Sequence, residues 1–304
     1  MRLVTRSDFD GLACAVLLKE VGIVDERQFV HPKDIQDGLL QITNNDILAN
    51  VPCAEGCGLW FDHHSSEQER IDLKGRYEGD SRSAPSAARV IYDYYGGKEK
   101  FRHLEAMMAA VDKADSAQFT VEEILHPQGW ELLAFVMDPR TGLGRFRDYT
   151  ISNYQLMDDM IEYCRRMNVE EILLLPDVQE RVVRYFEQNE LFTQMILKHT
   201  KTKDNAIITD LRNVETIYSG NRFLIYSLYP DQNISVWIID GRNKQNCVFA
   251  VGHSIINRTS RTDVGSLMLK YGGGGHKVVG TCQVPYEDTD KVLNELLLVI
   301  TTNN

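Results

Sequence analysis

The sequence predicts a two-domain α/β protein whose first domain is built on a parallel β-sheet. The chain has 304 residues, which is enough for two domains of ordinary size. Short apolar segments alternate with helical patterns from residue 1 to residue 114, as expected for a parallel sheet covered by helices. Beyond a polar stretch at 198–205 the pattern changes to short strands separated by turns.

The first domain is expected to alternate strands and helices in chain order. Leu3 and Val4 lead a first strand, and the helix at 12–21 is expected to end at Gly22. Further strands are predicted at 25–30, 46–48 and 58–61, and further helices at 83–95, 100–114, 148–166 and 169–199. Strands of a buried parallel sheet are short apolar runs of this kind.

The predicted domain boundaries follow from the change of pattern. Residues 1–197 form the first domain, a parallel sheet with helices on both faces, and 198–205 is the predicted linker. Residues 206–304 form a smaller α/β domain with strands at 206–208, 217–218, 223–229, 234–239 and 247–251. We expect the active-site cleft between the two domains.

The net charge of −11 is concentrated in one part of the chain. The first 200 residues hold 22 Lys and Arg against 34 Asp and Glu, whereas the last 104 hold 11 against 10. Such acidity disfavours a broad basic face for long nucleic acid but suits carboxylates that hold cations. No apolar segment approaches the roughly 18 residues of a membrane span, and no secretory leader is apparent, so we expect a cytoplasmic protein with no membrane partner.

Two aspartates lie in the turn between the first strand and the first helix. Asp8 and Asp10 belong to the sequence Ser-Asp-Phe-Asp-Gly at 7–11. Ligands of a parallel sheet bind outside the carboxyl ends of its strands, so both carboxylates are expected to point there. A helix N-cap is the alternative, but it explains one aspartate better than two.

A second cluster, Asp62-His63-His64, directly follows the apolar run at 59–61. Imidazole is a common ligand of transition metals, and an adjacent carboxylate can fix its tautomer. Asp46 and Asp112 are further candidates, although either can be an ordinary surface residue. Mixed carboxylate and imidazole ligands suit Mn²⁺ or a related ion, and bridging carboxylates can hold two ions about 4 Å apart.

A third motif is the run of four glycines at 272–275, followed by His276. Four consecutive glycines are entropically costly unless backbone N–H groups must approach a ligand closely; a flexible hairpin loop is the alternative. Arg258, upstream, adds a guanidinium group that can pair with phosphate. We therefore expect the second domain to bind the anionic part of a substrate through Arg258, Gly273, Gly274, Gly275 and His276.

Taken in order, these motifs resemble those of the DHH phosphoesterase superfamily with its DHH-associated C-terminal domain. The resemblance spans nearly the whole chain. It is strongest to bacterial exopolyphosphatase-related proteins and to the oligoribonuclease and pAp-phosphatase relatives. It implies a metal-dependent phosphohydrolase in which activated water cleaves phosphodiester or phosphomonoester bonds of short oligonucleotides or of cyclic or linear dinucleotides.

The resemblance also implies a set of site residues. One ion would be held by Asp10, Asp46, His63 and Asp112, and another by Asp8 with Asp46 as a shared bridge. His64 would orient the site or contact substrate, with Asp62 supporting it. The ion would be Mn²⁺, or Mg²⁺ or Co²⁺, with one or two ions bound, since Val4 stands where many relatives have His. Asp115 is an alternative to Asp112.

Two other functions remain open at this point. An exopolyphosphatase or pyrophosphatase would line its cleft with several cations, but the chain has no basic run longer than Arg165-Arg166. A non-catalytic nucleotide sensor is favoured by Val4 and opposed by the retained carboxylates. A homodimer is compatible with the sequence.

Overall fold

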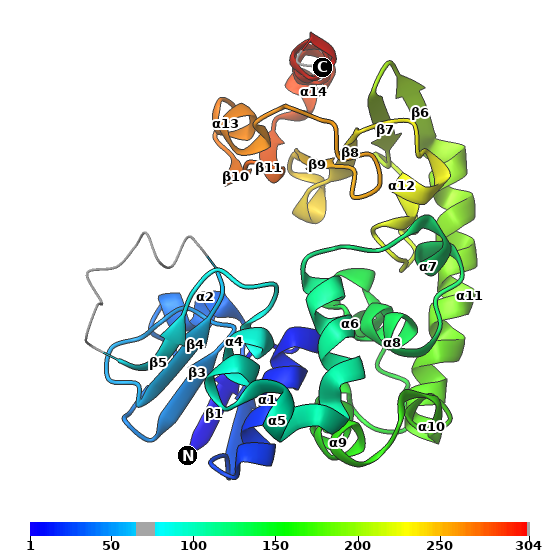
Figure 1. Cartoon of the computed structure of the whole chain (residues 1–304). Helices are drawn as coiled ribbons and strands as arrows, with labels where there is room; N and C mark the ends of the chain where they lie inside the picture. The colour runs from blue at the N-terminus through cyan, green and yellow to red at the C-terminus, as the bar shows by residue number, and fades with distance from the viewer. Residues whose placement is uncertain (65–76, 303–304) are drawn as a thin grey trace. The chain divides into compact units, whose positions relative to one another are not determined.

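The computed structural model describes residues 1–64 and 77–302 (Figure 1). Contacts between residues divide the chain into two compact units. Unit 1 comprises Met1–Gln118 and Pro127–Arg184, and unit 2 comprises Phe119–His126 and Tyr185–Asn304. Each unit contains its own β-sheet.

The described residues of unit 1 form a five-stranded sheet in the order β2-β1-β3-β4-β5, with every neighbouring pair parallel. Its strands are β1 (Arg2–Thr5), β2 (Glu26–Phe29), β3 (Asp46–Ala49), β4 (Leu59–Asp62) and β5 (Glu78–Ser81). The central strands β1, β3 and β4 are almost entirely buried. Since parallel strands run in the same direction, their carboxyl ends lie together at one edge of the sheet.

Alternate residues of the strands enter two different layers of the core. Val4, Leu48 and Trp60, which are in register on β1, β3 and β4, pack with Ile35 of α2 (Pro32–Gln36). Partly buried residues from the segment 40–57 complete that layer. On α1 (Phe9–Val21), residues 9–18 are buried, and this helix packs against α4 (Ala87–Tyr94) and α9 (Asn153–Arg166).

The sequence explains why α1 starts and stops where it does. Asp8 is the N-cap, its carboxylate accepting a hydrogen bond from the backbone N–H of Gly11, and Gly22 ends the helix in the left-handed conformation. Gly11 is required by close packing, because a Cβ there would lie 2.0 Å from the carbonyl oxygen of Arg6. The turn between β1 and α1 is therefore tightly folded.

Helices make up the rest of unit 1. They are α4 (Ala87–Tyr94), α5 (Gly97–Phe101), α6 (Glu105–Asp115), α8 (Gly129–Met137), α9 (Asn153–Arg166) and α10 (Val169–Leu173), with short 3-10 turns at Arg102–Leu104, Pro139–Thr141 and Leu143–Arg145. The long helix α11 (Pro176–His199) contains the division between the two units. No helix among the described residues is long and apolar enough to cross a membrane.

The described residues of unit 2 form a six-stranded mixed sheet in the order β10-β11-β9-β8-β7-β6, and among these strands only β7 and β8 pair in parallel. The strands are β6 (Thr200–Lys203), β7 (Ala206–Asp210), β8 (Ile234–Asp240), β9 (Cys247–His253), β10 (Gly274–His276) and β11 (Val279–Val284). The helices are α7 (Val121–Leu125), α12 (Leu224–Leu228), α13 (Val264–Leu269) and α14 (Thr289–Thr302), with 3-10 turns at Arg242–Lys244 and Tyr286–Asp288. Residues of α13 and α14 pack with the strands in one apolar core.

The predicted α/β fold with a parallel N-terminal sheet is confirmed, and two predicted strands are wrong. Residues 223–229 contain the helix α12 instead of a strand, and residues 217–218 belong to no strand. The polar stretch 198–205 holds the end of α11 and the edge strand β6, which pairs with β7. Exposed lysines protect an edge strand from further pairing, and they make such a strand resemble a linker in the sequence.

Candidate active site

The carboxyl edge of the unit 1 sheet gathers polar side chains from three strands. Asp8 and Asp10 follow β1, Asn50 follows β3, and Asp62 ends β4 with His63 next in the chain. Asp8, Asp10, Asn50 and Asp62 are all buried. Burial of so many charged and polar groups at one place is costly unless each has a partner.

Asp10 is anchored by the start of another helix. Its carboxylate accepts hydrogen bonds from the backbone N–H groups of Ala87 and Ala88, at 2.9 and 2.8 Å. Burial raises the pKa of Asp10 well above its usual value, and the charges of Asp115 and Asp8 add to this effect. A nearby cation would stabilise the ionised carboxylate.

The ring orientation of His63 identifies the nitrogen that is free to bind a ligand. Nδ1 lies 3.2 Å from the carbonyl oxygen of Ala84, which can only accept, so Nδ1 carries a proton. In the neutral ring Nε2 then presents its lone pair. Nε2 lies 3.2 Å from a carboxylate oxygen of Asp115 and 3.8 Å from one of Asp10, and it is buried without a hydrogen bond among the described residues.

These groups fit a divalent cation. One ligand atom each from Asp10, His63 and Asp115 lies within 4.8 Å of the others. A lone pair facing two carboxylates is repulsive unless a proton or a metal ion lies between them, and burial raises the pKa of Asp115, with the charge of Asp8 acting in the same direction. Two carboxylates and an imidazole are ligands suited to Mn²⁺ and related ions.

Asp62 and His64 form a second pair beside this cluster. Nδ1 of His64 lies 2.9 Å from Oδ1 of Asp62, and this hydrogen bond raises the pKa of His64. The Asp62 side chain is 1% exposed and that of His64 is 40% exposed. A fixed, partly exposed imidazole next to a cation site can transfer a proton to or from a substrate.

Asp8 has partners at both carboxylate oxygens. Oδ1 accepts hydrogen bonds from the backbone N–H of Gly11 at 2.9 Å and from Nδ2 of Asn50 at 3.1 Å. Oδ2 lies 3.0 Å from Nε of Arg6. Neither Asn50 nor Arg6 is predicted as a site residue from the sequence. Asn50 is nevertheless the first polar residue after an apolar strand, which is the same signal that indicates Asp62.

The prediction that Asp46 belongs to this site is wrong. Asp46 begins β3 and pairs in register with Arg2, so it lies at the amino edge of the sheet, opposite the edge that carries Asn50. Its carboxylate accepts hydrogen bonds from Arg2 at 2.6 and 2.9 Å and from the backbone N–H of Thr43 at 2.7 Å. Asp46 is therefore a structural residue.

Asp112 also lies outside the cluster, and Asp115 takes the position expected for it. One oxygen of Asp112 accepts a hydrogen bond from the hydroxyl of Ser86 at 2.7 Å, and the other accepts two from Arg89 at 2.6 and 2.9 Å. Both aspartates lie on α6 one helical turn apart, and only Asp115 reaches His63. Of the two alternatives in the sequence, the geometry favours Asp115.

The glycine motif of unit 2 forms an edge strand. β10 pairs with β11, and a Cβ on Gly273 or Gly275 would lie 2.1 or 2.3 Å from a carbonyl oxygen of the neighbouring strand. Strand packing therefore accounts for these two glycines, whereas a Cβ on Gly274 would meet nothing within 4 Å. His276 and Arg258 are exposed, so their predicted role in substrate binding is sterically open.

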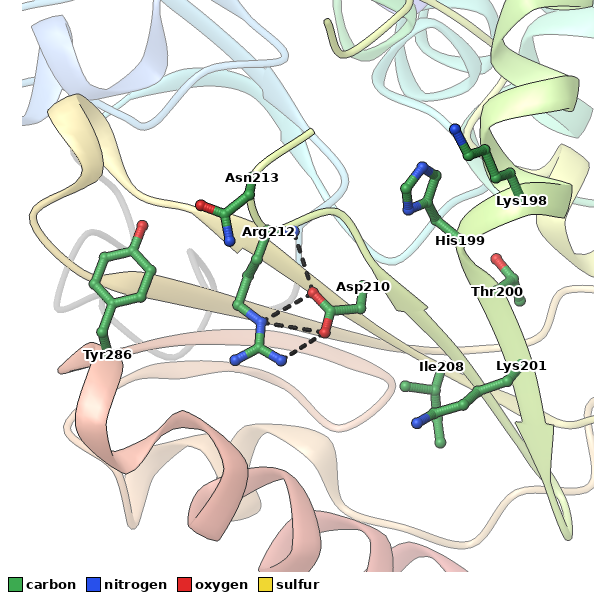
Figure 2. A pocket seen from close by; sticks show the side chains of 9 residues that line it. All are labelled: Lys198, His199, Thr200, Lys201, Ile208, Asp210, Arg212, Asn213 and Tyr286. Carbon is green, nitrogen blue, oxygen red and sulfur yellow. Dashed lines mark hydrogen bonds and ion pairs between the residues drawn. The ribbon is translucent and has the colours of Figure 1, made fainter. Parts of the chain in front are cut away.

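Unit 2 also contains a basic pocket of about 630 Å³ at the end of its sheet where β7 finishes (Figure 2). Lys198, Lys201 and Arg212 line it together with Asp210, which is hydrogen-bonded to Arg212. None of the site residues that the sequence predicts lines this pocket. Arg258 follows β9, whose carboxyl end pairs with the start of β8, at the opposite end of the sheet from Asp210.

Comparisons with known proteins agree with the fold and the site. The chain is 51% identical to PggH, a pGpG-specific phosphodiesterase from Vibrio cholerae, with 100% of this chain and 99% of that chain covered and a TM-score of 0.88. Two more distant structures show the fold alone. The DHH domain of a member of a ribosomal protein family has a TM-score of 0.62 at 14% identity, covering 100% of this chain and 87% of its own. RecJ from Thermus thermophilus, in complex with Mn²⁺, has a TM-score of 0.51 at 12% identity. The match covers 97% of this chain and 51% of the RecJ chain.

No family model and no curated protein matches the sequence. The fold, the carboxylate–imidazole cluster and the structural neighbours together define a phosphoesterase, an enzyme that hydrolyses phosphate esters. The chain belongs to the DHH phosphoesterase superfamily.

Proposed function

We propose that this phosphoesterase hydrolyses pGpG, a linear dinucleotide with a 5′-phosphate, to two molecules of GMP. The observation that carries the proposal is the 51% identity, over the whole chain, to a pGpG-specific phosphodiesterase. In this reaction the oxygen of water bonds to the bridging phosphorus, and the bond from phosphorus to the 3′-oxygen breaks. One proton of the water is lost, and the leaving 3′-oxygen gains one.

Asp10, His63 and Asp115 would hold a divalent cation, with Mn²⁺ as the first choice and Mg²⁺ or Co²⁺ as alternatives. Their support is the geometry of a buried imidazole lone pair between two carboxylates. A bound divalent ion lowers the pKa of a water molecule and stabilises negative charge on phosphate oxygens. The protein fixes the ligands beforehand, through Ala84 for His63 and through Ala87 and Ala88 for Asp10.

His64 would donate the proton that the leaving oxygen needs. Asp62 holds its Nδ1, so Nε2 of this partly exposed ring is the nitrogen left for the substrate. The raised pKa of His64, caused first by the hydrogen bond to Asp62, keeps more of the ring protonated near neutral pH. Asp62 in this arrangement positions the imidazole and does not itself contact the substrate.

Unit 2 would bind the rest of the dinucleotide through Arg258, His276 and the backbone at Gly274. Their exposure, and the open space above Gly274, support this assignment. A small anionic ligand also fits the charge of the chain, because a net charge of −11 disfavours a long polyanion.

The test is a comparison of substrates with matched variants. The purified full-length chain is incubated with Mn²⁺ and, in parallel, with pGpG, a cyclic dinucleotide, pAp and polyphosphate, and the products are separated by chromatography. We expect GMP from pGpG as the main product, loss of turnover in His63→Ala, and retained turnover in Asp46→Asn. Phosphate release from polyphosphate alone would instead support an exopolyphosphatase, and turnover by His63→Ala equal to the unmutated rate would exclude this site.

A further inference from the structure

We infer that this chain binds a single divalent cation, at Asp10, His63 and Asp115, and that the Arg6 guanidinium supplies the positive charge beside Asp8. The inference rests on the metal site proposed above. It concerns the position at which the resemblance to the DHH superfamily implies a second ion, held by Asp8 and a bridging carboxylate.

Both carboxylate oxygens of Asp8 already have hydrogen-bond or ion-pair partners within the protein. Oδ1 accepts hydrogen bonds from Gly11 and from the amide of Asn50, and Oδ2 is paired with Arg6 at 3.0 Å. Asp8 is 8% exposed, so water cannot readily replace these partners. A cation at Oδ2 would have to share that oxygen with the positive charge of Arg6, which repels it.

Asp46, the carboxylate expected to bridge two ions, does not lie beside Asp8. Asp46 lies at the amino edge of the sheet and is bound to Arg2. The residue at the carboxyl end of β3 is Asn50, which is 1% exposed and directs its amide N–H group toward Asp8. A neutral amide in this orientation donates a hydrogen bond and cannot share an anionic oxygen between two metal ions.

Asp62 is the other carboxylate that must be considered as a bridge. Its Oδ2 is buried without a hydrogen bond among the described residues, while its Oδ1 is held by His64. One ligand atom of Asp62 lies within 4.8 Å of one each from His63 and His64, and within the described part of the chain Asp8 belongs to no such group of three. The geometry therefore groups Asp62 with the two histidines and not with Asp8.

Val4, four residues before Asp8 in the chain, is the next side chain to consider as a ligand. Val4 is fully buried and packs with Leu48, Trp60 and Ile35 in the apolar layer of the sheet, so it offers no ligand atom. Among the described residues, Asp8 is left with Arg6 as its only cationic side-chain partner within ion-pair distance.

Arg6 is also placed to act on a substrate. Its side chain is 32% exposed, and its ion pair with Asp8 uses Nε, so the two terminal nitrogens can donate to phosphate oxygens. In this arrangement Arg6 contributes to phosphate binding with a fixed charge that needs no second ion.

The experiment measures metal content directly. Full-length protein is saturated with Mn²⁺ and passed through a desalting column. Its metal is counted by mass spectrometry, and its electron paramagnetic resonance spectrum is recorded. We expect one Mn²⁺ per chain with a spectrum free of Mn–Mn coupling. Two ions per chain with a coupled spectrum in the unmutated protein would overturn the inference.

Variants then test the two residues that exclude the second ion. The double variant Arg6→Ala/Asn50→Asp is expected to bind two Mn²⁺ per chain, and retention of one would contradict the role given to Arg6 and Asn50. Arg6→Ala alone is expected to raise the KM for pGpG more than it lowers kcat, with Arg6→Lys recovering part of the loss. An unchanged KM in Arg6→Ala would also overturn its role.

A control separates this inference from the proposed metal site. Asp10→Ala is expected to bind no Mn²⁺ under the same conditions. If Asp10→Ala binds as much Mn²⁺ as the unmutated chain, the metal site itself is wrong. If Asp10→Ala loses its ion but the unmutated chain holds two, only the single-ion inference fails. Circular dichroism of every variant confirms that it is folded.

Discussion

Nε2 of His63 lies 3.2 Å from a carboxylate oxygen of Asp115, and the two residues come from segments 52 positions apart in the chain. The ring faces this carboxylate with its lone pair because Ala84 accepts the proton on Nδ1. This contact is the geometric basis for the cation site proposed above.

Asp115 and Asp112 provide a matched pair of substitutions on one helix. Asp115→Asn is expected to weaken Mn²⁺ binding by more than about 100-fold, because a ligand should matter at least as much as the groups that orient it. Asp112→Asn is expected to cost about 1–3 kcal/mol of stability through its hydrogen bonds to Arg89 and Ser86, with Mn²⁺ affinity nearly unchanged. Calorimetric titration measures the Mn²⁺ affinity of each variant, and urea unfolding measures its stability. Greater loss of Mn²⁺ affinity in Asp112→Asn than in Asp115→Asn would reverse the assignment.

The two adjacent histidines are expected to fail in different ways. His64→Gln should lower kcat for pGpG by about 10²- to 10⁴-fold, the usual contribution of a proton-transferring group, while Mn²⁺ binding is kept. His63→Gln should lose Mn²⁺ as well as turnover. Parallel steady-state kinetics and metal analysis check this. Loss of Mn²⁺ from His64→Gln would show that this ring is a ligand.

Asp46→Asn tests whether Asp46 is structural. We expect unchanged kcat and KM and a loss of about 1–3 kcal/mol in the free energy of unfolding at neutral pH, because the hydrogen bonds from Arg2 and Thr43 to a charged carboxylate are weakened.

The same pair predicts a pH dependence of stability. The partners of Asp46 lower its pKa below the usual 3.8, against the opposing effect of burial. Its contribution is therefore fully present above the pKa of the unfolded chain and is lost as the pH falls through the lower pKa of the folded state. Urea unfolding of both proteins at pH 7 and at several pH values below 4 should show the difference between them shrinking with acidification. A difference that grows would contradict the ion pair.

Neighbouring glycines of β10 separate packing from ligand binding. Gly275→Ala should destabilise unit 2, since Gly275 has a φ of 155° and its Cβ would lie 2.3 Å from the carbonyl oxygen of Val279. Gly274→Ala should leave stability unchanged because its Cβ meets nothing within 4 Å. If the backbone at Gly274 approaches substrate, this second variant raises KM for pGpG. Thermal unfolding measures the stability of both variants, and steady-state kinetics measures their KM for pGpG. An unchanged KM in Gly274→Ala would remove Gly274 from the proposed substrate site.

The basic pocket of unit 2 supplies a charge-matched control for the kinetics. Removing two positive charges in Lys198→Ala/Lys201→Ala should leave kcat and KM for pGpG unchanged, because neither lysine is among the proposed site residues (Figure 2). The same number of charges removed by Arg6→Ala/Arg258→Ala should raise KM. Equal effects of the two double variants would mean that only the overall charge of the protein matters.

Most of the parallel sheet and part of the site follow from the sequence because apolar runs reveal where buried strands end. On this basis Asp8, Asp10, Asp62 and His63 are predicted at one sheet edge, and the structure brings them to that edge. Asp46 is misplaced by the sequence analysis because it precedes the apolar residues of its strand. The polar residue that follows those apolar residues is Asn50.

Tertiary packing decides the remaining features, and the sequence carries little trace of it. Asp112 and Asp115 are three residues apart on α6, so periodicity places them on the same face of the helix and cannot choose between them. Only the position of α6 in unit 1 selects Asp115. Arg6 is brought beside Asp8 by the tight turn between β1 and α1. In this turn the backbone of Gly11 packs against the carbonyl oxygen of Arg6. The segment Phe119–His126 joins unit 2 although unit 1 residues flank it in the chain, and no compositional change marks its ends.

The hydrogen bonds from Ala87 and Ala88 to Asp10 join residues 77 and 78 positions apart. Asp10 thus stabilises the start of α4 in the manner of a capping residue supplied by another part of the chain. During synthesis the cation site cannot be complete until α4 and the later helix α6 have left the ribosome and packed. A ribosome-bound chain that ends before residue 115 should therefore bind no ion tightly, and metal uptake would report the packing of α4 and α6 at the sheet edge.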